Sequence, residues 1–110
     1  MAIKITVSNT VSFQVRGTVA DEGGNAQAFS FSLIAKRLLS DELQAYLADE
    51  DRKVPDFMAG VVTDWRGVLD DEGNTVPFSA DALHRLFQIP GIAGLAFRQY
   101  LIEIGAKEKI

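Results

Sequence analysis

The chain of 110 residues contains no cysteine. This absence excludes a disulfide framework, a thiolate nucleophile and a cysteine-based zinc site, so packing alone must stabilise the fold. Apolar runs of the ~20 residues that span a membrane are also lacking, and the first ten residues alternate apolar with polar side chains, unlike a secretory signal. We therefore expect a protein with no membrane partner that stays in the compartment where it is made.

Basic residues are few and scattered. Eleven Lys and Arg stand against 15 Asp and Glu, which gives a net charge of −4, and two basic residues are adjacent only at 36–37 and 52–53. Because a phosphate backbone is bound by a basic stripe, this pattern argues against nucleic acid as a partner. The acids cluster at residues 49–51 and 70–72, where we expect a solvated helix end and a solvated turn.

Histidine occurs once, at His84, beside Arg85 in a segment of helical periodicity. A catalytic base needs a nucleophile and an orienting acid within hydrogen-bonding reach. No serine or acid is spaced from His84 in a way that indicates such a catalytic group. We expect His84 to be an exposed or half-exposed helix residue, and we assign no catalytic residue.

Two other motifs raise the question of a bound ligand. Residues 70–74 carry four oxygen-bearing side chains around Gly73, as a calcium loop does, but the spacing lacks the alternating ligands and the twelfth-position glutamate of an EF-hand. Gly91 and Gly94 open a helix without the lysine or the preceding strand of a phosphate-binding loop. We interpret the first motif as a polar hairpin turn and the second as a helix junction, and expect neither metal nor cofactor.

The first third of the chain has the two-residue period of β-strands. Apolar side chains alternate at Ile3, Ile5 and Val7, and again from Val11 to Val19. Residues 21–25 are turn formers that include two glycines, and the alternation resumes from residue 29 to residue 35. This pattern predicts a long antiparallel hairpin in which residues 11–20 pair with residues 26–35.

The period changes to a helical one at Ser40. A serine followed by two acids is typical of a helix N-cap and first turn, which predicts a helix over residues 41–51 with Ser40 as its cap. Pro55 suits the first turn of a second helix, because apolar residues then recur at helical spacing through Val62 and Trp65.

Two further helices are expected after a small hairpin or tight loop at residues 68–76. Ser79 is the predicted N-cap of the first, which ends before Pro90. The last helix has an apolar face that includes Ala93 and Ile104, and Gly105 is its candidate C-cap.

Together these elements predict an α+β fold, an N-terminal antiparallel β-hairpin or small sheet followed by four short helices. The length allows one hydrophobic core, so residues 1–110 are expected to form a single domain. Within it we expect a β-rich part at residues 1–37, a helical part at 38–105 and a frayed tail at 106–110.

A series of short motifs follows in close order between residues 62 and 101. They are Asp-Trp-Arg-Gly-Val at 64–68, an acidic glycine-containing turn at 70–73, Val-Pro-Phe-Ser at 76–79, leucines at 83 and 86, Pro-Gly-Ile at 90–92 and Tyr-Leu at 100–101. This part of the chain resembles the small tail assembly chaperones of long-tailed bacteriophages and prophages. The hairpin before it resembles them only loosely.

The resemblance implies a protein without enzymatic activity that acts in the cytoplasm of the bacterial host. It implies that the protein holds the long, helical tape measure protein soluble until tail tube subunits polymerise around it. The tape measure protein is then the main partner, and the tail tube protein and a second copy of the chain are further candidates. A helical client with an apolar face needs a partner with grooves and exposed apolar side chains.

The C-terminal helical part has more apolar side chains than one small core needs. We therefore predict that partner binding involves Trp65, Phe78, Leu83, Phe87, Phe97, Tyr100 and Leu101. A single tryptophan is more often a core anchor, although tryptophan is also the residue type richest in binding hot spots. Trp65 is therefore expected either to anchor the core or to bind the partner.

Other classes of protein also fit the sequence. A structural virion protein, such as a tail completion or tube-associated subunit, would share the size, acidity and hairpin, but would remain in the finished particle. A small enzyme is a weaker alternative because no pair of titratable groups converges by spacing. A host-directed inhibitor is compatible with the composition.

Overall fold

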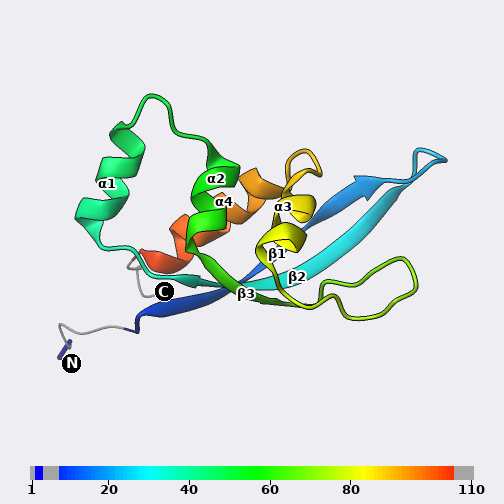
Figure 1. Ribbon diagram of the computed structural model, residues 1–110, viewed down its shortest axis with the longest axis horizontal. Coiled ribbons are helices and arrows are strands. Elements are labelled where there is room, and N and C mark those ends of the chain that lie inside the picture. Colours follow the sequence, from blue (N-terminus) through cyan, green and yellow to red (C-terminus); the bar gives the residue numbers. More distant parts are fainter. Residues whose placement is uncertain (1, 4–7, 106–110) are drawn as a thin grey trace.

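The computed structural model describes residues 2–3 and 8–105. Figure 1 shows its strands and helices, which are, in chain order, β1 (Thr10–Ala20), β2 (Ala26–Lys36), α1 (Ser40–Ala48), α2 (Val54–Val61), β3 (Val62–Arg66), α3 (Ala80–Phe87) and α4 (Ile92–Ile104). The predicted α+β fold, with an N-terminal hairpin and four short helices, is confirmed. Ile5 and Val7 of the first alternating segment, and the tail at 106–110, lie outside the described residues.

The hairpin forms in the predicted register. Val11 pairs with Ala35 and Ala20 pairs with Ala26, so the antiparallel ladder runs without interruption between the predicted limits. Alternation determines this register, because a shift by one residue would turn the whole apolar set of each strand towards water.

The helices cover one face of the sheet. Val11, Phe13 and Val15 of β1 are buried, whereas the residues between them are exposed, and Figure 1 shows all four helices on the same side of the strands. The largest fully buried side chains come from the strands and from three of the helices; they are Tyr100, Leu33, Met58, Leu83 and Val15. Burying each large aliphatic side chain contributes roughly 1.5–3 kcal/mol, so this single layer is the main source of stability.

The second helix is shorter than predicted. It ends at Val61, and the chain passes directly into β3, which adds to β2 and makes the sheet order β1-β2-β3. Opposite β2, Leu33 pairs with Trp65 and Ala35 with Val62, so the register shifts by one residue between them. This irregularity turns Val62 and Trp65, three positions apart, to the same buried face. The predicted helix through Trp65 was wrong because that spacing imitates the period of a helix.

The start and end of α1 also differ from the prediction. The helix begins at Ser40 itself, and Leu39 occupies the cap position, where its N–H donates to the Glu42 carboxylate at 3.1 Å. The Glu42 carboxylate thus satisfies the N–H of the cap residue, and no described side chain caps the first N–H groups inside the helix, as had been expected of Ser40. The helix ends at Ala48, before the acids at 49–51, and the N–H of Asp49 donates to the Tyr46 carbonyl in a tightened last turn.

The last two helices start close to where the sequence places them. The Ser79 hydroxyl accepts the N–H of Ala82 at 3.0 Å, which confirms the predicted N-cap of α3. Gly91 stands before α4 with φ +90°, a conformation that favours glycine. At the other end Gly105 is the C-cap as expected, but its backbone is extended rather than left-handed.

Hydrogen bonds from two side chains tie α4 to the end of β2. The Tyr100 hydroxyl donates to the Lys36 carbonyl at 2.6 Å and accepts the N–H of Leu38 at 3.3 Å. The Arg37 guanidinium donates to the Ile104 carbonyl at 3.0 Å, at the C-terminal end of α4, where a positive charge is favourable. The last helix is thereby fixed to the sheet at one end of the molecule.

Candidate protein-binding groove

The residues predicted to bind a partner are placed at two different ends of the helical layer. Trp65, Leu83, Phe87 and Tyr100 are buried, and Phe78, Phe97 and Leu101 are half-buried. The four buried side chains supply core packing in this conformation. Any accessible apolar surface beside them therefore comes from neighbouring residues, and the binding role of the seven stays a prediction.

One end is closed by an aromatic cluster between α1, α2 and α4. Phe57 stacks on Tyr46 with a ring-centroid distance of 4.0 Å and meets Phe97 and Tyr100 edge-on at 5.6 and 5.9 Å. Such contacts contribute roughly 0.5–1.5 kcal/mol each beyond the area they bury. Phe97 and Tyr100 therefore join α4 to the first two helices.

At the other end, Trp65 holds a projecting segment, residues 67–76, which we call the arm. Its indole N–H donates to the Val76 carbonyl at 2.8 Å, and its ring meets Phe78 edge-on at 5.3 Å. Within the arm, the N–H of Val76 donates to the Val68 carbonyl at 2.9 Å, and Leu69 and Thr75 form an isolated bridge. The expected small hairpin at 68–76 is therefore present.

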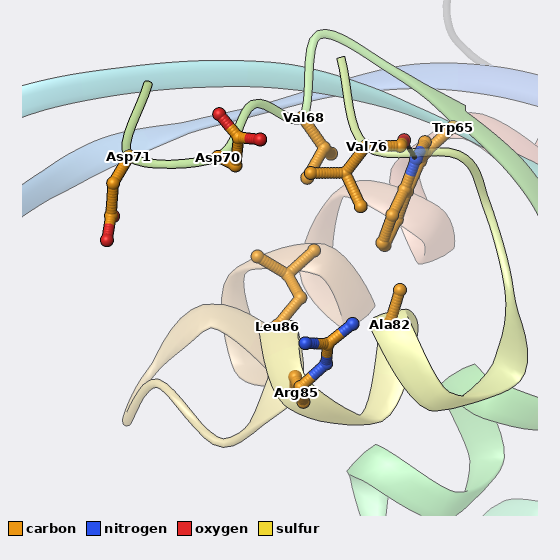
Figure 2. Close-up of a pocket in the computed structure, with 8 residues that line it drawn as sticks. All are labelled: Trp65, Val68, Asp70, Asp71, Val76, Ala82, Arg85 and Leu86. Carbon is orange, nitrogen blue, oxygen red and sulfur yellow. Dashed lines mark hydrogen bonds between the residues drawn. The ribbon is translucent and has the colours of Figure 1, made fainter. Parts of the chain in front are cut away.

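A first hollow lies between the arm and α3 (Figure 2). Its floor is apolar and is formed by Trp65, Val68, Val76, Ala82 and Leu86, while Asp70, Asp71 and Arg85 stand around it. Its volume is about 290 Å³.

The carboxylate of Asp70 is occupied by the arm's own turn. One of its oxygens accepts the N–H groups of Glu72 and Asn74, both at 2.9 Å, and Gly73 supplies the φ of +83° that closes the turn. Across the described ranges, 2–3 and 8–105, the side chains form no group of three or more His, Cys, Asp or Glu that could hold a metal ion. These hydrogen bonds show that the polar residues 70–74 form a tight turn.

A second hollow, which we call the apolar groove, lies on the other side of Val68 and Leu86. The hairpin contributes Val19, Phe29, Ser30 and Phe31, the arm contributes Gly67, Val68 and Leu69, and the α3–α4 junction contributes Leu86, Ile89 and Ile92; the volume is about 180 Å³. Val19, Leu69 and Ile89 are large apolar side chains with exposed fractions of 39%, 58% and 40%. Three exposed side chains from three separate elements therefore converge on one hollow.

The wall of the groove at Phe29 depends on a glycine of β1. A Cβ atom at Gly17 would lie 2.8 Å from Cζ of Phe29 and 3.1 Å from Cδ1 of Leu95. The Phe29 ring thus lies over the position where a side chain of residue 17 would be, and it faces Phe31 at a centroid distance of 6.0 Å.

Sequence reasoning missed Val19, Leu69 and Ile89. Each lies at the end of an element, next to a polar turn or a Pro-Gly pair. A single apolar residue at such a place is only a weak indication of a binding surface. Their convergence depends on contacts between distant segments, which no local pattern records.

Three titratable side chains of the helical layer, His84, Tyr46 and Tyr100, differ in their environments. His84 is exposed on α3, as expected, and its ring Nε2 lies 3.4 Å from Nε2 of Gln88. Burial raises the pKa of both Tyr46 and Tyr100 above the usual tyrosine range, so both are neutral at physiological pH. Within the described residues the Tyr46 hydroxyl is buried without a hydrogen-bond partner, which costs folding free energy.

No protein-family model, curated protein or solved structure matches the chain. Among the described residues, no helix has the length and apolar character needed to cross a membrane.

Proposed function

We propose that this protein is a phage tail assembly chaperone that binds the tape measure protein and keeps it soluble in the bacterial host cytoplasm. The observation that carries the proposal is the apolar groove, where Val19, Leu69 and Ile89 are exposed around one hollow. Two of the three segments that form it, the arm and the α3–α4 junction, lie in the part of the chain that resembles tail assembly chaperones.

Exposed aliphatic side chains that gather around a hollow are typical of a surface that a partner covers. Scattered apolar residues on a surface need no such explanation, but a group of this kind does. The proposed chaperone would transiently cover the apolar face of its client and release it when tail tube subunits replace it.

The test is co-expression of the tape measure protein with and without the full chain, followed by centrifugation and pull-down. We expect the tape measure protein to remain in the supernatant, in complex with the chain, only when both are present. A tape measure protein that is equally soluble and stable alone would contradict the proposal.

The alternative function, a structural virion protein, is favoured by a different feature. β1 is an edge strand of 11 residues without proline, and no described residue pairs with its outer edge. Such an edge can extend a sheet from one subunit into another. Mass spectrometry of purified particles separates the two functions, since a structural protein is found in them and a chaperone is absent.

A further inference from the structure

We infer that the apolar groove binds one face of an amphipathic helix whose flanking positions carry lysine or arginine. The inference rests on the proposed function for the helical nature of the partner. It adds where the partner binds, how it is anchored and which charge it carries.

The size of the groove favours a protein partner over a small ligand. Its volume is about 180 Å³, whereas pockets for small molecules have roughly 300–1,000 Å³. A hollow of this size accepts one or two large apolar side chains. The exposed side chains around the hollow would then contact neighbouring positions of the same partner. Around a binding hot spot such contacts contribute little binding energy but exclude water.

The walls of the groove suit a helix. Val19 stands on the hairpin, Leu69 on the arm and Ile89 at the α3–α4 junction, so the hollow is bounded on several sides by different elements. A helix that lies between such walls presents side chains at i, i+3, i+4 and i+7 to the floor and leaves its other faces free.

Charge decides which helix fits. The two hollows share Val68 and Leu86, and Asp70 and Asp71 line the first of them, across that shared wall from the apolar groove. In the chain these acids and Glu72 directly follow Leu69, which lines the groove. Within the described part of the chain, Asp71 and Glu72 have no ion pair, and Arg85 is the only basic residue that lines either hollow. Lysine or arginine beside the apolar face of the partner would compensate these acids, and glutamate there would be repelled.

The test uses the full chain and two synthetic peptides of about five helical turns. One peptide has leucine on one face and lysine on the other, and its counterpart has glutamate in place of lysine. Fluorescence anisotropy gives the affinities, and NMR chemical-shift mapping locates the site. We expect the lysine peptide to bind with shifts at Val19, Leu69 and Ile89, and the glutamate peptide to bind at least roughly tenfold more weakly at low salt.

Matched variants distinguish the groove from general stickiness. Leu69→Ser and Ile89→Ser remove exposed apolar side chains inside the groove, and Leu47→Ser and Ile102→Ser remove comparably exposed ones outside it. We expect the first pair to lower the affinity about tenfold and the second pair to leave it within about twofold. Because all four side chains are exposed, the melting temperature should be nearly unchanged in each.

A third pair of variants tests the charge. Glu72→Gln should weaken the lysine peptide a few-fold and reduce the salt dependence of its affinity, whereas Glu50→Gln, in the other acidic cluster, should do neither. Equal losses in groove and control variants, or equal binding of both peptides, would overturn the inference. If these results hold and the tape measure protein is nonetheless soluble alone, the proposed function fails and the binding site remains.

Discussion

The molecule contains two hairpins whose strands are joined by the same type of turn. In residues 21–25 and 70–74 alike, the first aspartate accepts two backbone N–H groups on one carboxylate oxygen, all at 2.9 Å. In both, the N–H of the fourth residue donates to the carbonyl of the first at 3.0 Å, and that fourth residue is a glycine with φ near +80°, Gly24 at +80° and Gly73 at +83°. This is a type I turn followed by a glycine bulge.

What the turns connect is very different. The first joins strands with 11 residue pairs, and the second joins segments whose pairing is a single bridge, at Leu69 and Thr75. The turn reverses the chain equally well in both, so it does not determine how long a hairpin grows. The long hairpin has a base of alternating apolar residues that the helices cover, Val11 to Val15 in β1 and Phe31 to Ala35 in β2, which the arm lacks. The arm is instead held to the core by the indole hydrogen bond to Val76 and by the packing of Val68 and Val76.

The largest expected effect breaks the support of the arm. Trp65→Ala should lower the free energy of unfolding by about 3–5 kcal/mol, because a buried ring is replaced by a cavity. Trp65→Phe keeps an aromatic ring and removes the bond to Val76, so it should cost about 1–2 kcal/mol and speed amide exchange in the arm more than in the hairpin. Urea denaturation and hydrogen exchange measure both. An unchanged melting temperature for Trp65→Ala would place Trp65 outside the stabilising core.

The next largest effect is expected from a matched pair of substitutions at the two turn glycines, Gly24 and Gly73. A Cβ at Gly24 or Gly73 meets no atom within 4 Å, so valine at either position is penalised only for its positive φ. We expect each substitution to cost about 1–3 kcal/mol. Gly73→Val should also weaken binding of the lysine peptide, because it moves the arm, and Gly24→Val should not. Equal effects on binding would mean that the arm does not shape the groove.

A smaller effect distinguishes the two aspartates. The pKa of Asp21 is lowered by the N–H of Asn25 and by the side chain of Gln27, which donates to its second oxygen at 2.9 Å, and Val76 at the corresponding place in the arm has no such donor. A carboxylate with a lowered pKa stabilises the fold above its ordinary value of 3.8 and loses that contribution as the pH falls through the lowered pKa.

Asp21→Ala should therefore lower the melting temperature at pH 7, and the difference from the natural chain should shrink as the pH is taken below 3.8. Gln27→Ala should reproduce part of the effect. A difference that grows with acidity would contradict the assignment of the stabilising form to the carboxylate.

The smallest effect is expected at Asp71. Its side chain is exposed and the N–H groups of the turn are bonded to Asp70 instead, so Asp71→Asn should change the stability by less than about 0.5 kcal/mol, far less than Gly73→Val. Millimolar calcium should leave the melting temperature of the natural chain unchanged, since the turn already uses Asp70 for backbone N–H groups. A rise of several degrees that a chelator reverses would restore the calcium interpretation.

The sequence predicted the long hairpin well because its information is local. Val11 to Val15 and Phe31 to Ala35 alternate without a break, and a turn of known type joins them. β3 could not be predicted in the same way, since its bulge opposite Ile34 and Ala35 replaces the two-residue period with a three-residue one. The predicted N-cap at Ser79 was correct, whereas the one at Ser40 was wrong because the helix begins one residue earlier, with Leu39 at the cap position.

The apolar groove was beyond sequence reasoning for a different reason. Val19, Leu69 and Ile89 are far apart in the chain and follow no common period, so only the packing of the arm between the hairpin and α3 brings them together. The predicted set around Trp65 identified the neighbourhood of one hollow, but its aromatic members are mostly inside the core.

The Phe29 ring above Gly17 has a consequence for how such a sequence evolves. A Cβ atom at position 17 would lie 2.8 Å from the tip of that ring, so a substitution there requires the ring to move or residue 29 to change as well. Because Phe29 is also part of the wall of the groove, each such step alters the shape offered to a partner. We therefore expect residues 17 and 29 to covary among descendants of this sequence, and the anchoring side chain of the partner to change with them.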